Sequence, residues 1–191
     1  MKKNSYDGWE LHDFDKAFNF RQYQYSFFKR YLKGNIAEIG PGNGYFVSKY
    51  LENKSNKIHL FEPSLNLYKN LKKRVKKSKK IKIYNNKLKL KKDYYDCIIY
   101  LDVIEHIKND VMEIRKAYSS LKKNGHIIIC VPAFQFLYSN FDKDVGHIKR
   151  YRKKDFQVLQ EKIKFNLIKL RYFDSIGFFL SFISKTFLNK N

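Results

Sequence analysis

The sequence predicts an α/β protein with a mostly parallel, twisted sheet and helices on both faces. Three observations lead to this prediction. Short apolar runs of strand length alternate along the chain with segments whose apolar residues recur at helical spacing. The first run passes directly into the glycine-rich stretch "EIGPGNG", and acidic residues close the second and fourth runs. Strands that alternate with helices imply right-handed crossovers, and therefore parallel pairing.

Residues 6–33 carry aromatic and apolar residues at helical spacing, and Gly34 follows them as an expected helix C-cap. The expected strands, which are apolar and short, are 35–40, 57–64, 80–84, 94–103, 126–133 and 165–173. The expected helices, which are amphipathic, are 45–53, 65–80, 109–125 and 153–162. No internal repeat or linker interrupts them, so we expect one domain over residues 1–191.

Composition limits the class of protein. At 191 residues and 43% hydrophobic content the chain can bury a single core. Cys97 and Cys130 both lie in strand-like runs and suggest neither a disulfide framework nor a metal site, so we expect a reducing cytoplasm and no bound metal. The N-terminus lacks the apolar core of a signal peptide, and no apolar run reaches the roughly 20 residues of a spanning helix.

The formal net charge of +22 raises the possibility of a nucleic-acid partner. Most of the 40 basic residues are Lys, and the chain is rich in Asn, Ile, Tyr and Phe and poor in Ala, Gly and Pro. An AT-rich genome imposes this composition through its codons, so a solvated lysine coat is one interpretation. Binding to phosphates or to an anionic membrane surface is the other.

The glycine loop holds Gly40, Gly42 and Gly44, each separated by one residue. A phosphate-binding P-loop would end in Lys-Ser or Lys-Thr, and none follows. A dinucleotide fingerprint needs its third glycine at the position of Tyr45. The loop therefore fits neither phosphate template, and an ordinary glycine turn is the alternative to a site of close backbone approach.

Four features fall at the carboxyl ends of expected strands, where parallel sheets bind ligands: the glycine loop, Glu62, Asp102 and Pro132. Glu62 follows Gly40 by 22 residues, and its carboxylate can accept hydrogen bonds from both hydroxyls of a ribose. The alternative for Glu62 is an acid that favours a helix N-terminus. A nucleoside with an amino acid as its 5′ substituent fits a ribose site beside such a loop.

The stretches "EIGPGNG", "FEPS", "YYDCIIYLDVIEHI" and "LKKNGHIIICVPA" together resemble the class I S-adenosylmethionine-dependent methyltransferases over residues 36–133. The resemblance implies a Rossmann-like fold, with S-adenosyl-L-methionine as the cofactor. It implies that the three glycines approach the methionine and ribose parts, that Glu62 holds the ribose diol, and that an amide near the third strand meets adenine. The cofactor-binding residues implied are Glu38, Gly40, Gly42, Gly44, Glu62, Asn86 (less readily Asn85), Leu101 and Asp102.

The flanks "AFNFRQYQY" and "VPAFQFLYSNFDKDVGHIKRY" resemble a bacterial subgroup often encoded beside glycosyltransferases. This resemblance implies that residues 1–34 form a helical lid over the cofactor, residues 35–173 the α/β core, and residues 174–191 an apolar C-terminal segment. The subgroup's loop signature keeps, in order, Asp144, Gly146, His147, Arg150 and Tyr151, with Lys149 in place of an arginine. Phe20 stands where a tyrosine is common, so a hydroxyl contact to the cofactor is lost.

Methyl transfer to a hydroxyl needs an oriented acceptor and removal of a proton, and histidine is the usual base near neutral pH. His106 lies just beyond the fourth strand, where the methyl group is expected, and His147 lies in the loop expected to cover the pocket. Both are candidate catalytic residues; otherwise His106 caps a helix and His147 fixes its loop. Arg150 and Tyr151 are candidate substrate-binding residues, because a guanidinium pairs with phosphate or carboxylate. A solvated basic stretch is the alternative.

The expected function is methyl transfer to a small-molecule or glycoconjugate acceptor, such as a lipid-linked sugar, on oxygen. An RNA methyltransferase is favoured only by charge, because neither an "NPPY"-like motif nor a cysteine placed as a pyrimidine nucleophile is present. A non-catalytic protein that kept the fold is the third alternative. The usual final hairpin of the sheet is shortened. Residues 174–191 either replace its missing strand or form a helix on an anionic membrane, which places the protein in the cytoplasm or at the inner membrane surface.

Overall fold

The computed structural model describes residue 8 and residues 11–85 and 91–188. Within this part of the chain the fold divides into two compact units. The first, here called the sheet unit, runs up to Val103 and includes Lys116–Cys130. The second, here called the C-terminal unit, comprises Ile104–Arg115 and the chain from Val131 onward.

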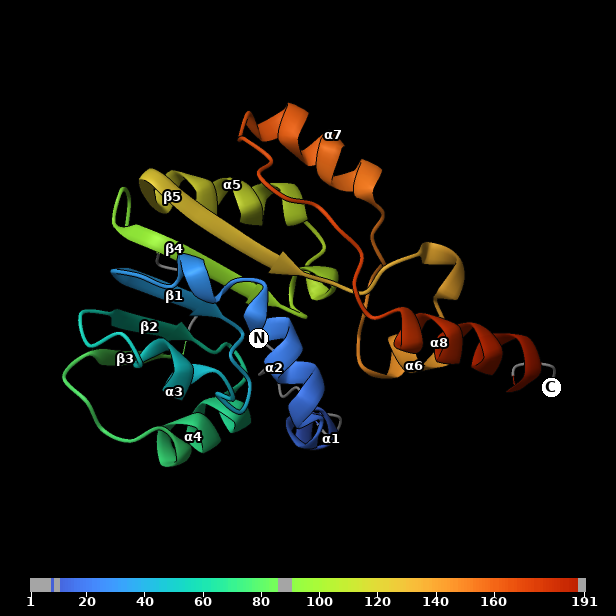
Figure 1. The fold of residues 1–191 in the computed structure, drawn as a ribbon, viewed down its shortest axis with the longest axis horizontal. Coiled ribbons are helices and arrows are strands. Elements are labelled where there is room, and N and C mark those ends of the chain that lie inside the picture. The colour runs from blue at the N-terminus through green and yellow to red at the C-terminus, as the bar shows by residue number, and fades with distance from the viewer. Residues whose placement is uncertain (1–7, 9–10, 86–90, 189–191) are drawn as a thin grey trace. The chain divides into compact units, whose positions relative to one another are not determined.

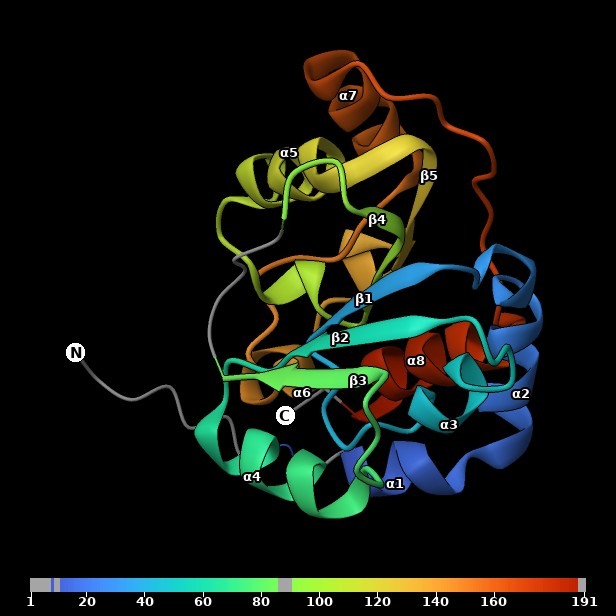
Figure 2. The same cartoon turned by 90° about the vertical axis from the view of Figure 1, so that its left-hand side faces the viewer.

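The sheet unit is built on five parallel strands in the order β3-β2-β1-β4-β5. Figures 1 and 2 both show them side by side in this order, with β3 and β5 at the two edges. Their bounds are β1 Asn35–Ile39, β2 Lys57–Phe61, β3 Ile81–Tyr84, β4 Tyr95–Leu101 and β5 Leu121–Cys130. The order reverses between β1 and β4, which makes the carboxyl ends of these two strands the topological switch point of the sheet. The predicted parallel α/β fold is confirmed.

Helices precede and connect these strands. Their bounds are α1 Leu11–Lys16, α2 Phe18–Ser26, the 3-10 helix η1 Lys29–Tyr31, α3 Val47–Tyr50, α4 Leu65–Arg74 and α5 Asp110–Ser120. The helical pattern of residues 6–33 is thus divided among α1, α2 and η1. Helix α4 lies next to β3 and ends early, because Val75 is already extended.

One face of the sheet forms the core of this unit. Ile36, Ile58 and Cys97 occupy paired positions on β1, β2 and β4, and all three are fully buried. Side chains from the helices, from the residues that flank them and from the next positions along the strands complete the cluster: Phe28, Leu32, Phe46, Val47, Tyr50, Leu60, Leu71 and Ile99. Glu38 follows Ile36 on this face by the two-residue alternation of a strand, which places a carboxyl group at the end of an apolar surface.

The boundary between α5 and β5 differs from the expectation. The helix ends at Ser120 instead of Gly125, and the strand begins at Leu121 instead of His126. Leu121 pairs with Tyr95, and a register shift then brings His126 opposite Cys97. Pairing of Leu121 with β4 therefore begins the strand inside a segment whose leucine and lysines also suit a helix. Gly125 lies inside the strand, where a Cβ atom would come within 3.0 Å of the Tyr95 and Lys122 carbonyl oxygens.

The C-terminal unit is helical. Besides the first half of α5, its elements are the 3-10 helices η2 Ile104–His106 and η3 Gln135–Leu137, and the helices α6 Asn140–Asp144, α7 Lys153–Ile163 and α8 Ser175–Leu188. The strand predicted at 165–173 is wrong. This segment is irregular, and it is held by side chains: the Tyr172 ring lies 4.6 Å from that of Phe134, and its hydroxyl accepts a hydrogen bond from the Lys153 N–H.

The last segment forms α8, so the expectation that it replaces a strand of the sheet is wrong. Asp174 caps the helix by accepting a hydrogen bond from the Gly177 N–H at 2.8 Å. Phe178 packs against Phe134, with ring centroids 5.2 Å apart. In the described residues, no helix has the length and apolar character needed to cross a bilayer.

Candidate functional site

The glycine loop leaves β1 at the switch point. Gly40, Gly42 and Gly44 all have positive φ, at 63°, 54° and 76°. The Gly40 N–H donates to the Phe61 carbonyl at the end of β2, which fixes where the loop begins. A Cβ atom on Gly40 would lie 2.7 Å from the Val103 side chain. Left-handed backbone and close neighbours therefore both require glycine, and the loop presents backbone rather than side chains.

Glu62 is attached to this loop by its carboxylate. Its Oε2 accepts a hydrogen bond from the Gly42 N–H at 3.1 Å, and its Oε1 accepts one from the Ser64 N–H at 2.9 Å. The side chain is only 3% exposed. Burial raises its pKa to about 7, against the lowering effect of the two backbone N–H groups. The structure thus brings together two features that the sequence separates by 20 residues, the central glycine and the acid of β2.

Glu38 and Arg21 are buried charged residues of the sheet unit. Burial raises the pKa of Glu38 to about 7, while Tyr50 and Arg21 act in the opposite direction. Arg21 is 7% exposed and donates from Nη1 to Gln24 Oε1 at 3.0 Å. The same nitrogen lies 3.7 Å from Asp102 Oδ2. A buried guanidinium at this rim was not predicted, although an arginine within the aromatic stretch "AFNFRQYQY" was a visible signal.

Asp102 follows β4 with φ at 56°, a conformation that few non-glycine residues adopt. Its N–H donates to the Cys130 carbonyl at the end of β5, and its side chain remains exposed. Leu101, half-buried, precedes it. Asn86 lies outside the described residues. The neighbouring Asn85 donates from Nδ2 to the Glu62 carbonyl at 2.9 Å. The cofactor contacts of these residues stay predictions.

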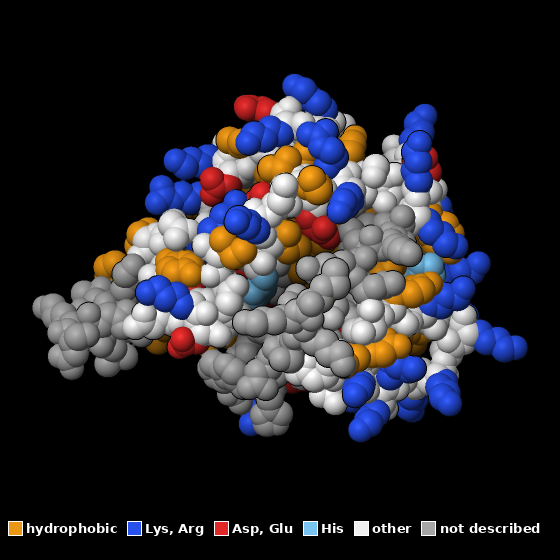
Figure 3. All heavy atoms as spheres, turned by 180° about the vertical axis from the view of Figure 1, so that it is seen from behind, with side chains coloured by type: hydrophobic (Ala, Val, Ile, Leu, Met, Phe, Trp, Pro, Cys, Tyr) orange, Lys and Arg blue, Asp and Glu red, His pale blue; other side chains and the backbone are white. Residues whose placement is uncertain are grey.

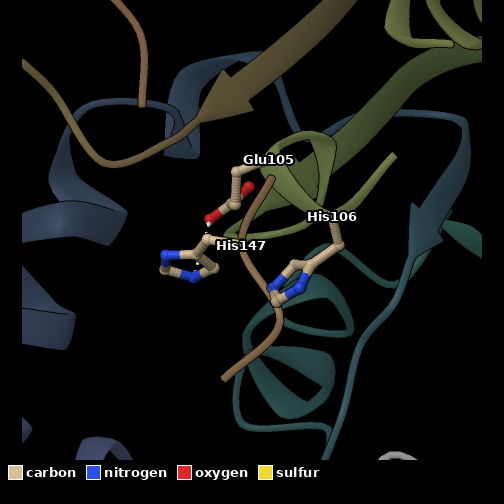
Figure 4. Close-up of side chains that lie close together, drawn as sticks. All are labelled: Glu105, His106 and His147. Atoms are coloured by element: carbon tan, nitrogen blue, oxygen red, sulfur yellow. Dashed lines mark ion pairs between the residues drawn. The ribbon is translucent and has the colours of Figure 1, made fainter. Parts of the chain in front are cut away.

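The C-terminal unit brings the two candidate catalytic histidines together. Figure 4 shows His106 and Glu105 on η2 and His147 on the loop after α6. The two imidazole rings are 4.8 Å apart at 72°. His106 Nδ1 lies 3.1 Å from the Gly146 carbonyl oxygen, and Gly146 has φ at 81°. Burial, followed by the proximity of His147, lowers the pKa of His106 to about 4, so His106 is neutral at neutral pH.

Asp142 organises the loop around His147. It is fully buried, and its Oδ1 lies 2.8 Å from His147 Nδ1. Burial opposes its ionisation, but hydrogen bonds from His147, Arg150 and the Ser139 N–H hold its pKa well below the usual range. Asp144, the acid of the loop signature, is exposed at the end of α6, and the residue that contacts His147 is Asp142. Sequence spacing alone does not distinguish two aspartates two residues apart.

The candidate substrate-binding residues have internal partners. Arg150 donates from Nε and Nη2 to the two oxygens of Asp142, at 2.8 and 2.9 Å. Tyr151 is 2% exposed, and its hydroxyl donates to Asp110 Oδ2 at 2.9 Å. Lys149 Nζ is paired with the same Asp110 at 2.7 Å. These contacts give both residues a structural role, and their role in binding an acceptor stays a prediction.

The basic side chains do not gather in one patch on the face that Figure 3 draws. Figure 3 shows Lys and Arg side chains scattered among apolar and uncharged groups on the face that it draws. On this face the pattern is that of a solvated coat.

Comparisons with known proteins bear on this geometry. A family model described as "Methyltransferase domain" matches residues 12–170. No curated protein matches the sequence. A S-adenosylmethionine-dependent methyltransferase of Archaeoglobus fulgidus has a similar structure, with a TM-score of 0.67 and 17% identity over 81% of this chain and 72% of that one.

Two further solved structures are similar. Phosphoethanolamine N-methyltransferase 2 of Haemonchus contortus, solved with S-adenosyl-L-methionine, has a TM-score of 0.65 and 17% identity over 83% of this chain and 41% of that one. A candidate methyltransferase of Bacillus halodurans has a TM-score of 0.62 and 16% identity over 73% of this chain and 66% of that one. The chain thus spans just under two thirds of the Bacillus protein. At these identities the likeness shows a shared fold.

Proposed function

Because this chain belongs to the methyltransferase-domain family, we infer that it is an S-adenosylmethionine-dependent methyltransferase, and we propose a hydroxyl group of a small molecule or glycoconjugate as its acceptor. One observation carries the cofactor half of this proposal. The buried Glu62 carboxylate is joined to the Gly42 N–H at the switch point of a parallel sheet, where such folds bind nucleosides.

In this proposal the ribose diol donates to Glu62, and the adenosine and methionine parts lie along the glycine loop. The Haemonchus enzyme of similar fold binds S-adenosyl-L-methionine, which supports the same ligand here. Arg21 suits the methionine carboxylate, because a guanidinium in a buried setting pairs strongly with an anion. Leu101 and Asp102 are assigned to the methionine side and Asn86 to the adenine side.

The C-terminal unit supplies the residues for the acceptor. We assign activation of the acceptor hydroxyl to His106 and His147, whose rings lie together and are oriented by Gly146 and Asp142. Transfer forms an O–CH₃ bond, breaks the S–CH₃ bond of the sulfonium, and releases S-adenosylhomocysteine and the hydroxyl proton. Orientation and proton removal are what the protein must contribute.

Calorimetry with S-adenosylmethionine and S-adenosylhomocysteine, followed by mass spectrometry of hydroxylated sugar and sugar-phosphate acceptors, tests this function. We expect binding of both ligands and a product heavier by one methyl group. A chain that binds neither ligand contradicts the proposal and favours a protein that kept only the fold. Transfer to RNA but to no sugar would favour the RNA alternative.

Helix α8 points to the kind of acceptor. Ile176, Phe179, Leu180 and Ile183 follow the spacing i, i+3, i+4, i+7 and are 74%, 61%, 62% and 50% exposed. The helix sequence contains no acidic residue, in a chain with a net charge of +22. We propose that this stripe lies on an anionic membrane surface, which suits a lipid-linked sugar acceptor.

We also propose that residues 1–191 form one folding domain, as the sequence predicts. Helix α5 supports this, because its residues are divided between the two units: Asp110–Arg115 belong to the C-terminal unit and the rest to the sheet unit. A single calorimetric unfolding transition is expected, and two separate transitions would contradict it.

A further inference from the structure

The cluster of Glu105, His106 and His147 has the composition of a metal site. Each residue offers one ligand atom, and these atoms lie within 4.8 Å of one another (Figure 4). Two imidazoles and one carboxylate are a common ligand set for divalent transition metals, which bind fewer oxygen atoms than Mg²⁺ or Ca²⁺ do.

Both imidazoles are held by an outer partner, as metal-ligating histidines usually are. His147 Nδ1 lies 2.8 Å from Asp142 Oδ1, and His106 Nδ1 lies 3.1 Å from the Gly146 carbonyl oxygen. The Gly146 carbonyl oxygen can only accept, and both Asp142 oxygens also accept hydrogen bonds from Arg150 and Ser139, so each Nδ1 atom faces an acceptor. An imidazole that donates from Nδ1 keeps the lone pair of Nε2 for a cation.

The Glu105 carboxylate lies where a third ligand beside the two imidazoles is needed. Glu105 is fully buried, and its Oε1 lies 3.8 Å from His147 Nε2. This distance is too long for a hydrogen bond. It suits two ligands of one ion, since ligands about 2.1 Å from a shared ion are separated by at most about 4.2 Å. The three ligand atoms together spread over as much as 4.8 Å, so the cluster must close slightly around a bound ion. The neighbouring cations Arg150 and Lys149 are paired with Asp142 and Asp110.

We propose that Glu105, His106 and His147 bind one divalent transition-metal cation, such as Zn²⁺. This departs from the sequence-based expectation of no metal. It rests on the proposed function in one respect: three protein ligands leave a position open, where the ion would hold the acceptor oxygen and lower the pKa of its hydroxyl. The two histidines then act on the acceptor as ligands, and solvent receives the proton.

Metal binding by the full-length chain tests the proposal without methyl donor or acceptor. After treatment with a chelator, the protein is titrated with ZnCl₂ by calorimetry and with CoCl₂ by visible absorption. We expect one ion per chain and a cobalt spectrum of nitrogen and oxygen ligands. Glu105→Gln and His147→Gln should each weaken binding by about 100-fold or more, since even outer partners cost roughly 10–100-fold.

His126→Gln is the matched control, because His126 lies in the sheet unit beside Tyr31 and should leave the affinity unchanged. Circular dichroism checks the fold of each variant, and His106→Gln replaces any variant that unfolds. Absence of one-to-one binding, or wild-type affinity in the cluster variants, overturns the metal site. Either result leaves cofactor binding and methyl transfer intact, so failure of the site and failure of the proposed function are distinguishable.

Discussion

Glu62 and Gly42 are linked by a hydrogen bond of 3.1 Å between the carboxylate Oε2 and the backbone nitrogen. This contact connects the end of the second strand to the middle of the glycine loop. It places a hydrogen-bond acceptor beside backbone that has no side chain of its own, which is the combination that a nucleoside with a bulky 5′ substituent needs.

Replacing Glu62 by alanine should weaken binding of S-adenosylmethionine at least tenfold. The change removes two charge-assisted hydrogen bonds to the ribose diol, each worth roughly 1.5–3 kcal/mol. Calorimetry measures the affinity, and circular dichroism verifies the fold. Glu161→Gln on the exposed side of α7 is the matched control and should bind normally. Unchanged affinity in Glu62→Ala would remove the ribose assignment.

The pKa of Glu62 predicts opposite pH trends for stability and for binding. In the folded protein the pKa of Glu62 is about 7, above the ordinary 4.5. The pKa of Glu38 is raised to about 7 as well. Between pH 4.5 and 7 the folded state keeps protons that the unfolded state has lost. The melting temperature of the free protein should therefore fall as pH rises through this window.

Cofactor affinity should instead rise from about pH 6 to 8, because the diol donates to the ionised carboxylate of Glu62. Binding near pH 7 should release protons, which calorimetry in buffers of different ionisation enthalpy detects. Glu62→Gln should remove most of both trends, with Glu38 responsible for the remainder. Affinity that is independent of pH in the wild type would count against ionisation of Glu62 on binding.

Gly42→Ala should impair cofactor binding more than it lowers the melting temperature. The φ of 54° is strained for alanine, and the added Cβ would lie 3.0 Å from Leu11 Cδ1. Combining it with Leu11→Ala separates the two causes. If crowding of Leu11 were responsible, the double variant would recover affinity. We expect no recovery, because the added methyl group keeps the cofactor from the backbone. A Gly42→Ala protein that binds normally would show that the glycine serves only the turn.

Arg21→Met should reduce affinity for S-adenosylmethionine by about tenfold or more, as expected for loss of a hydrogen-bonded charge pair. 5′-Methylthioadenosine, which lacks the amino acid carboxylate, provides the internal control, and its affinity should change little. Equal losses for the two ligands would indicate that Arg21 only supports the local structure, through Gln24 and Asp102.

Changing Phe179 and Leu180 together to glutamate should abolish co-sedimentation with anionic vesicles while the protein stays folded. Both side chains are exposed, whereas Phe178 packs against Phe134 and is left intact. Val158→Glu is the control, because it changes an exposed apolar residue of α7 outside the stripe. This variant should bind vesicles normally. Deleting residues 175–191 should have the same effect as the double change. A wild-type chain that ignores vesicles contradicts membrane binding.

The sequence by itself determined the fold class and the edge of the sheet at which the glycine loop and Glu62 meet. A short, nearly continuous apolar run makes a strand that is buried on both faces recognisable from its own residues, and helices between such strands leave parallel pairing as the outcome. The glycine loop could also be recognised from the sequence, because a positive φ is a local requirement that glycine meets. Glu62 followed from the same reasoning, since the carboxyl ends of neighbouring parallel strands meet at one edge.

Tertiary structure alone decided the features that depend on partners distant in the chain. The strand β5 begins at Leu121, which pairs with Tyr95 of β4, where the sequence also suits a helix, and residues 165–173 are irregular. Asp142 rather than Asp144 contacts His147 because α6 turns one aspartate inward and leaves the other exposed. Such choices are set by which side chains a folded backbone brings within hydrogen-bond distance, and spacing along the sequence does not contain that information.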